Sequence, residues 1–285
     1  MSVLILGGRG NLGTQLTKAF VSDFETVSLD KDDFDILDFN LLSEAISNLK
    51  PDLIINAVAY NAVDKCENKE DFALAYKLNV ELPSFLATLS RQLKTVFIHF
   101  SSDYVFNGID EKREFSEDET PNPINKYGES KFAGEREVIK QGEFGLNYYL
   151  IRTSKLFGPK GESDLSKPSF FDLMLKAASI KPEVSVVNEE LSCFTYTPDL
   201  AAATKRLWEI EAPYGVYHLV NEGPATWLDG AEFLFSLKKM PVVIKPIRSE
   251  NLLRAARRPK FSILKNNKIK KLRPFSEALK EYLKN

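Results

Sequence analysis

The sequence predicts an α/β protein in which a doubly wound parallel sheet is followed by a smaller C-terminal lobe. The first half of the 285 residues alternates short apolar runs with segments in which apolar residues recur every three or four positions. These are the patterns of strands and helices. The runs are continuous, as in parallel strands covered by helices on both faces. Beyond about residue 155 the composition shifts and the regular order is lost.

The first predicted strand and helix enclose a glycine turn. Residues 3–6 form an apolar run, and Gly7, Gly10 and Gly13 follow at a spacing of three. An ordinary glycine-rich turn is one interpretation. Between a strand and a helix, however, the pattern predicts a dinucleotide-binding turn of the Rossmann type. Gly7 would make the tight turn, Gly10 would let a pyrophosphate approach the backbone, and Gly13 would let the helix pack on the strand.

The second predicted strand, residues 26–30, ends in the carboxylate of Asp30. Its distance from the glycines, roughly 20 residues, is typical of the acid that binds the adenosine ribose. Such a carboxylate accepts hydrogen bonds from the ribose hydroxyls and repels a 2′-phosphate, which favours NADH. Lys31 follows at once and offers a partner for a 2′-phosphate, so the sequence leaves NADPH open.

Further strands and helices complete the predicted core. The strands are expected at residues 53–57, 96–102 and 148–152, and the helices at residues 41–49, 71–93 and 127–141. Asn40 is the expected N-cap of the first of these helices, and Pro83 marks a break in the second. We interpret His99 as a core histidine because it lies inside a strand. Ligands of such sheets bind at the carboxyl ends of the strands, where polar residues follow each run.

The chain is expected to divide near residue 155. Residues 1–155 would form the dinucleotide-binding core, and residues 156–285 mainly a substrate-binding lobe, with some segments returning to the core. The loop at residues 158–167 is a candidate lid. Helices are expected near residues 170–178, 198–208, 226–237 and 275–283, and strands near residues 184–187, 216–219 and 242–247.

The composition is that of a soluble globular protein, with 44% hydrophobic residues and a net charge of −2. This charge gives no support for binding nucleic acid, and no apolar stretch is long enough to span a membrane. Cys66 and Cys193 are the only cysteines, and residues 1–6 lack the basic region of a secretion signal. We therefore expect a cytoplasmic protein, with no residues assigned to a metal.

Tyr127 and Lys131 are four residues apart on a predicted helix, so their side chains share a face. A lysine ammonium stabilises a nearby phenolate and lowers the tyrosine pKa, which makes the tyrosine a usable general acid or base. Ser102, at the tip of a strand, would hydrogen-bond the same substrate oxygen. Tyr-x-x-x-Lys alone is common, and two solvated helix residues are the alternative.

Several stretches of the chain carry a resemblance to a known family. They are residues 7–13, 56–65, 101–106, 123–131, 152–154 and 258–264. On these stretches the chain resembles, over nearly its whole length, the extended short-chain dehydrogenase/reductases that act on nucleotide sugars. Within that group it is most similar to the dTDP-4-dehydrorhamnose reductase family. The stretches Ser-Asp-Tyr-Val-Phe and Arg-Pro-Lys-Phe-Ser are specific to this branch, whereas Tyr-x-x-x-Lys indicates only the superfamily.

The resemblance implies that NADPH or NADH reduces the C4 ketone of a nucleotide-linked deoxyhexose. Tyr127 would donate the proton, Lys131 would be its partner, and Ser102 would stand in for the family's usual threonine. Asp103 and Lys155 would lie on the sugar side. With the motif residues above, the expected cofactor site consists of Gly7, Gly10, Asn11, Leu12, Gly13, Asp30, Lys31, Asp35, Ile36, Ala57, Ala59, Tyr60, Asn61, Tyr127 and Lys131. A nucleotide sugar is the expected partner, and a homodimer is left open.

The chain departs from the family pattern mainly on the sugar side. Lys155 stands where a tryptophan is usual, residues 188–196 differ from the usual pattern, and Asn61 replaces a threonine. Three alternatives follow: an epimerase/reductase, a non-catalytic regulatory subunit that kept the cofactor site, and a 4,6-dehydratase. A dehydratase would carry Asp-Glu after the catalytic hydroxyl residue, and Tyr104 after Asp103 counts against it.

Overall fold

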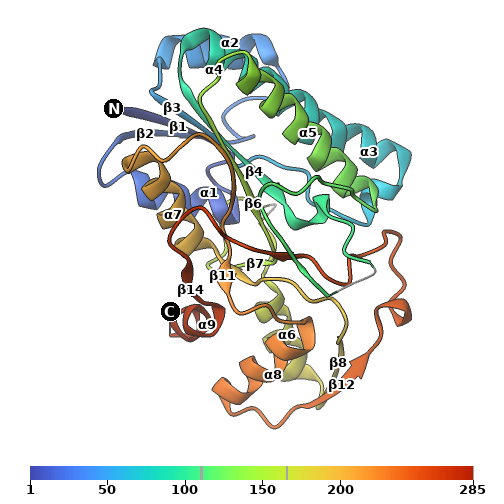
Figure 1. Cartoon of the computed structure of the whole chain (residues 1–285). Coiled ribbons are helices and arrows are strands. Elements are labelled where there is room, and N and C mark those ends of the chain that lie inside the picture. The colour runs from blue at the N-terminus through green and yellow to red at the C-terminus, as the bar shows by residue number, and fades with distance from the viewer. Residues whose placement is uncertain (110–111, 165, 285) are drawn as a thin grey trace.

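A six-stranded parallel sheet, in the order β10-β6-β4-β3-β1-β2, forms the centre of the molecule (Figure 1). The computed structural model describes residues 1–109, 112–164 and 166–284. The strands are β1 (Ser2–Leu6), β2 (Glu25–Leu29), β3 (Leu53–Asn56), β4 (Val96–Ser102), β6 (Tyr148–Thr153) and β10 (Gly215–His218). Every neighbouring pair in this sheet is parallel. The predicted fold class is confirmed.

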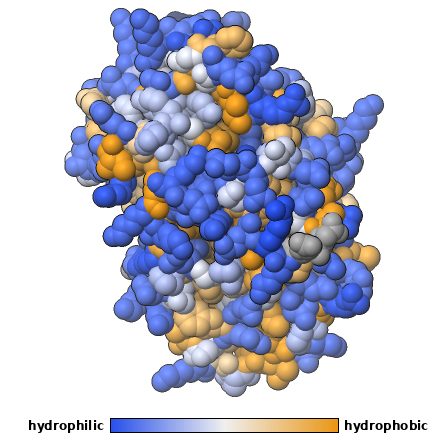
Figure 2. Space-filling model, in the orientation of Figure 1, coloured by the Kyte–Doolittle hydropathy of each residue, from blue (hydrophilic) through white to orange (hydrophobic). Residues whose placement is uncertain are grey.

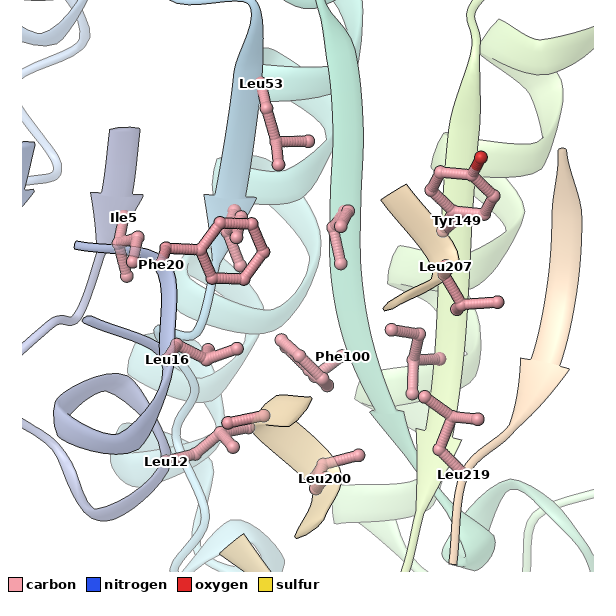
Figure 3. Close-up of a cluster of buried hydrophobic side chains, with 14 of the residues drawn as sticks. Ile5, Leu12, Leu16, Phe20, Leu53, Phe100, Tyr149, Leu200, Leu207 and Leu219 are labelled. Carbon is pink, nitrogen blue, oxygen red and sulfur yellow. The ribbon is translucent and has the colours of Figure 1, made fainter. Parts of the chain in front are cut away.

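Helices cover both faces of the sheet (Figure 1). One face carries α1 (Asn11–Phe20) and α7 (Thr197–Glu209), and the other carries α2 (Phe39–Leu49), α4 (Leu82–Leu93) and α5 (Lys126–Glu143). Because successive strand residues point to opposite faces, β1 sends Ile5 to the first core cluster and Leu4 to the second. Figure 3 shows the first cluster, in which Leu16 of α1 and Leu200 of α7 lie near Phe100 of β4.

Two details of the helices differ from the prediction. The N-cap of α2 is Asp38, whose Oδ1 accepts the backbone N–H groups of Asn40 and Leu41 at 3.1 Å. The prediction of Asn40 as the cap was therefore wrong. The long helix at residues 71–93 is broken as expected, but by the π-helical turn η2 (Lys77–Glu81) between α3 (Lys69–Tyr76) and α4. Pro83 lies in the first turn of α4, directly after this π-turn.

The smaller lobe has its own core of aromatic side chains. It contains α6 (Phe170–Ile180), α8 (Trp227–Lys238) and α9 (Phe275–Tyr282), with β8 (Glu183–Val187) paired in parallel with β12 (Val243–Ile247). Phe157, Phe171 and Phe194 pack together at its centre. Strand β10 and helix α7 lie instead with the large sheet. The division at residue 155 stays a prediction.

The remaining elements are short. They are β5 (Glu114–Phe115), β7 (Leu156–Phe157), β9 (Thr195–Tyr196), β11 (Asn221–Glu222), β13 (Ile263–Leu264), β14 (Leu272–Pro274), η1 (Lys65–Glu67), η3 (Asp103–Val105) and η4 (Ser249–Asn251). The face shown in Figure 2 is largely hydrophilic, with hydrophobic residues interspersed toward the smaller lobe. Among the residues that the structure describes, no helix is both long and apolar enough to cross a membrane.

Candidate active site

The glycine turn joins β1 to α1, and its three glycines meet different constraints. Gly7 has a φ of +77°, a conformation that residues with a side chain rarely adopt. A Cβ on Gly13 would lie 1.9 Å from the carbonyl oxygen of Gly7, so the helix packs on the turn only without one. A Cβ on Gly10 would meet only that same oxygen, at 3.3 Å. The protein itself therefore leaves room at Gly10.

The start of α1 offers hydrogen-bond donors to a ligand. Gly10 is the N-cap residue and has no side chain to bind the first-turn amides. Within the described residues, the backbone N–H groups of Asn11, Leu12 and Gly13 have no acceptor in the protein. Amides at a helix N-terminus, together with the helix dipole, favour a phosphate group. The residues present thus fit the diphosphate of a dinucleotide.

Substitution of Gly10 by valine tests this assignment. The backbone at Gly10 (φ −70°, ψ 170°) is extended and accepts a branched residue, and the nearest protein atom to the new Cβ would be 3.3 Å away. We therefore expect a folded protein with an unchanged thermal midpoint. Calorimetry should show NADPH affinity at least tenfold lower than wild type, because the side chain would occupy the space of the diphosphate. An unchanged affinity would mean that the site lies elsewhere.

The predicted lid loop, residues 158–167, lies directly against the glycine turn. Asn11 makes two bonds to it: its Nδ2 donates to the carbonyl of Lys167 at 2.8 Å, and its Oδ1 accepts the N–H of Gly161 at 2.9 Å. The N–H of Ser163 donates to the carbonyl of Arg9 at 2.8 Å. Position 165 of the loop lies outside the described residues. These bonds leave the first-turn amides of α1 free, and a role as a lid stays a prediction.

The ribose side of the site is built around Asp30, which follows β2. Its Oδ2 accepts the backbone N–H of Arg9 at 2.9 Å and its Oδ1 accepts that of Lys31 at 2.8 Å. The guanidinium of Arg9 pairs with Asp32 at 3.0 Å and with Asp33 at 2.9 Å. A carboxylate and an arginine therefore lie side by side where the adenosine ribose is expected.

Two other expected cofactor residues, Asp35 and Ile36, lie in the turn before α2. Asp35 accepts the N–H of Leu37 at 3.0 Å, and Ile36 is only 9% exposed in the core. A core position leaves Ile36 little surface with which to contact a ligand.

The segment after β3 carries Ala57, Ala59, Tyr60 and Asn61. The N–H of Ala57 donates to Leu6 at the end of β1. Tyr60 is fixed by Asn79 of η2, which accepts the Tyr60 N–H at 2.9 Å and donates to the Tyr60 carbonyl at 3.0 Å. The segment therefore runs past the carboxyl end of β3, beside the glycine turn.

Ser102, Tyr127 and Lys131 come from two elements that meet at the carboxyl edge of the sheet. Ser102 ends β4, and its side chain lies close enough to that of Tyr127 to act on its ionisation. Lys131 donates from Nζ to the carbonyl of Phe100, two residues before Ser102, at 2.7 Å. Helix α5 is held at its start by Asn125, whose side chain accepts the N–H of Gly128 at 2.8 Å. The structure thus brings the three residues together.

The electrostatics of the pair differ from the expectation. Burial raises the pKa of Tyr127, and the Ser102 side chain only partly opposes this. Burial also lowers the pKa of Lys131 to about 8, although Glu135 acts in the opposite direction. The lowering of the Tyr127 pKa that we expected from Lys131 is not found. Tyr127 is 9% exposed and Lys131 is 2% exposed. The Lys131 ammonium is hydrogen-bonded to the backbone carbonyl of Phe100.

On the sugar side, Lys155 is bonded within the protein. Its Nζ donates to the carbonyls of Glu190 at 2.7 Å and Ala225 at 3.0 Å. It also lies 4.4 Å from the centre of the Trp227 ring, a cation–π contact. Burial lowers the pKa of Lys155 to about 8. The side chain therefore ties together segments of the smaller lobe, and the contact with the sugar that we expected stays a prediction.

Comparison with known proteins shows to which family the chain belongs. A family model described as the RmlD substrate binding domain matches residues 1–285. The chain belongs to this family. The spore coat polysaccharide biosynthesis protein SpsK of Bacillus subtilis (strain 168) is 32% identical over 99% of this chain and 96% of its own length. A dTDP-4-dehydrorhamnose reductase of Aggregatibacter actinomycetemcomitans is 31% identical over 94% of this chain and 91% of its own.

The solved structure of a relative has the same fold as this RmlD-family chain. The crystal structure of a dTDP-4-dehydrorhamnose reductase from Bacillus anthracis, in complex with NADP, matches with a TM-score of 0.90. It is 31% identical, and the match covers 99% of this chain and 98% of that one. The predicted resemblance to the dTDP-4-dehydrorhamnose reductases is confirmed.

The sequence reasoning assigned no individual role to three residues that shape this RmlD-family site. Arg9 stands inside the glycine motif, where only its charge signalled a role. Asn79 is fully buried in η2 and also donates to Ser130 of α5 at 2.9 Å. Glu190 is 5% exposed and accepts hydrogen bonds from Trp227, Ser249 and Arg254. The partners of Asn79 and Glu190 lie far away in sequence, so no local pattern reveals them.

Proposed function

We propose that this protein reduces the C4 ketone of a 4-keto-6-deoxyhexose carried on a nucleoside diphosphate, with NADPH or NADH as the reductant. The observation that carries the proposal is the meeting of Ser102, Tyr127 and Lys131 at one edge of the sheet, in a chain whose first helix has free amides at its start. The dTDP-4-dehydrorhamnose reductases among its relatives support the reaction class.

The proposed chemistry assigns each of the three residues one task. The reduced nicotinamide, when bound, supplies the hydride for C4. Tyr127 gives its hydroxyl proton to the oxygen at C4, and Lys131 carries the positive charge that stabilises the phenolate left behind. Ser102, next to Tyr127, would contact the same oxygen. A tyrosine whose pKa is raised by burial is fully protonated at neutral pH, which suits a proton donor.

The proposed cofactor site accepts either nicotinamide dinucleotide. Asp30 can bind the ribose hydroxyls of NADH, whereas Arg9 and Lys31 beside it can pair with the 2′-phosphate of NADPH. The NADP bound in the Bacillus anthracis relative supports the second of these. We propose that Arg9 exchanges its two aspartates for the 2′-phosphate when NADPH binds.

The smaller lobe, mainly residues 156–285, is proposed to hold the nucleotide sugar against the carboxyl edge of the sheet. Lys155 and Glu190 would shape its sugar side through the contacts described above. We further propose a cytoplasmic location, as for a biosynthetic reductase, and association into a homodimer, which the scattering mass of the purified protein would test.

A spectrophotometric assay tests the proposed function. The protein is mixed with NADPH or NADH and a panel of 4-keto-6-deoxy sugar nucleotides, and the nicotinamide absorbance is followed. We expect loss of absorbance with at least one sugar nucleotide and none without it. Binding of NADPH without turnover of any member of the panel would favour a non-catalytic subunit. A product epimerised at another carbon would favour an epimerase/reductase.

A further inference from the structure

Asp103 is a buried carboxylate at the centre of the site, and three hydroxyl groups bind it. It follows β4 directly and is 3% exposed. Its Oδ1 accepts the hydroxyl of Ser102 at 3.1 Å, and its Oδ2 accepts those of Ser154 at 2.8 Å and Ser262 at 2.6 Å. Its two oxygens are thus engaged inside the protein, which leaves them poorly placed for the sugar contact that the sequence led us to expect.

The surroundings of Asp103 offer hydroxyl donors in place of a salt bridge. Within the described residues, no lysine or arginine nitrogen makes an ion pair with it. Lys155 is the cation that acts on it, through space, while the Lys155 ammonium itself binds two backbone carbonyls. Burial raises the pKa of Asp103, and the three hydroxyls and Lys155 oppose this. A carboxylate accepts hydrogen bonds only, so three donors favour its ionised form.

Asp103 reaches Tyr127 through Ser102. A serine hydroxyl has one proton, and Ser102 donates it to Asp103. The Ser102 oxygen then accepts the N–H of Tyr104 at 3.2 Å, and Ser102 also acts on the ionisation of Tyr127. Ser102 therefore lies next to both the buried carboxylate and the tyrosine.

We propose that Asp103 is a positioning residue of the proposed reduction, which fixes the Ser102 hydroxyl beside Tyr127. Its negative charge also keeps Tyr127 in the protonated form that donates to the sugar. This inference rests on the proposed function for its role in turnover. The negative charge of Asp103 raises the pKa of Tyr127, which burial already raises, and Cys66 acts in the same direction. Its charge also acts to raise the pKa of Tyr104 and of Cys193, which burial already raises, and that of Lys155, which burial lowers.

The Asp103→Asn variant tests the proposal in the full-length protein. The amide keeps the size of the side chain and can still bond the serines. We expect kcat to fall at least tenfold while KM for the sugar nucleotide changes less than threefold. Removal of a negative charge favours the phenolate, so the alkaline limb of the kcat profile should move to lower pH, by about one unit. A rise in KM alone, with the alkaline limb in place, would show a direct sugar contact and overturn the proposal.

A second measurement separates this inference from the proposed function. The ionisation of Tyr127 is followed by tyrosinate absorbance with NADP bound and no sugar, as the difference from the Tyr127→Phe variant. We expect this ionisation at lower pH in Asp103→Asn than in the wild type. If it shifts while no sugar nucleotide is reduced by the wild type, the proposed function fails but the effect of Asp103 stands. If it does not shift, Asp103 does not act on Tyr127 and the inference is wrong.

The Ser262→Ala variant is the matched control for a structural role. It removes a buried hydrogen bond on the side of Asp103 away from Ser102 and keeps the charge. We expect a lower thermal midpoint and an unshifted Tyr127 ionisation. A shift equal to that of Asp103→Asn would mean that loss of packing explains both.

Should Asp103→Asn not fold, Asp103→Glu moves the carboxylate by one methylene and keeps its charge. The inference then requires a lower kcat in Asp103→Glu, with Tyr127 ionising at the same pH as in the wild type. Ionisation of Tyr127 at a lower pH would contradict the inference.

Discussion

Replacement of Lys131 by methionine is expected to abolish measurable reduction and to weaken cofactor binding at the same time. The ammonium of Lys131 is 2% exposed and donates to the carbonyl of Phe100 at 2.7 Å. Methionine has a similar length and fills the same space, and it removes a buried charge whose desolvation is unfavourable. We therefore expect the variant to fold with a thermal midpoint close to that of the wild type.

The expected losses of Lys131→Met are of two kinds. Without the positive charge the phenolate of Tyr127 is not stabilised, and most of the roughly 10²–10⁴-fold that general acid catalysis contributes should be lost from kcat. A charged hydrogen bond to a ribose hydroxyl is worth about 1.5–3 kcal/mol, so Kd for NADPH should rise roughly 10- to 150-fold. Steady-state kinetics and calorimetry measure the two losses. Normal NADPH affinity would contradict the proposed ribose contact.

The same residue predicts a pH dependence in the wild type. Burial lowers the pKa of Lys131 to about 8, so its side chain is charged below that pH and neutral above it. NADPH affinity should therefore fall as the pH rises through about 8, and Lys131→Met should lack this fall. An identical pH dependence in both proteins would assign it to another group.

The order of the strands and helices could be predicted because each strand is a continuous apolar run ended by polar residues. Residues 96–102, for example, were predicted as a strand with the bounds that β4 has. The cap of α2 could not be predicted, because Asp38 and Asn40 both suit an N-cap and only the backbone decides between them. The π-turn at η2 likewise has no local signature, and it is stabilised by tertiary contacts of Asn79.

The candidate site could be predicted where function depends on spacing along one element. Gly7, Gly10 and Gly13 are spaced for one turn, and Tyr127 and Lys131 for one helix face. What could not be predicted depends on burial. The sequence suggested that Lys131 would lower the pKa of Tyr127, but desolvation dominates and raises it. Of the three serines around Asp103, Ser154 and Ser262 come from segments that meet it only in the folded chain.

Replacement of Tyr127 by phenylalanine should remove the reduction and leave the fold and cofactor affinity nearly intact. The substitution deletes one hydroxyl, while the ring keeps its edge-on contact with Tyr104, with centroids 5.8 Å apart. What is lost is the proton for the C4 oxygen, so kcat should fall about 10²–10⁴-fold. The unchanged Kd for NADPH would distinguish this variant from Lys131→Met.

Tyr104→Phe is the matched control, because it deletes a hydroxyl from the neighbouring, partly buried ring. Burial raises the pKa of Tyr104 as it does that of Tyr127, with Asp103 adding to the rise. The structure bonds Ser102 to the Tyr104 backbone N–H rather than to its hydroxyl. We therefore expect Tyr104→Phe to keep most of the wild-type kcat. If Tyr127→Phe retained more than about a tenth of the rate, a loss below the low end of general acid catalysis, Tyr127 would not be the proton donor. The proposed mechanism would then be wrong, even in a chain that binds the cofactor as proposed.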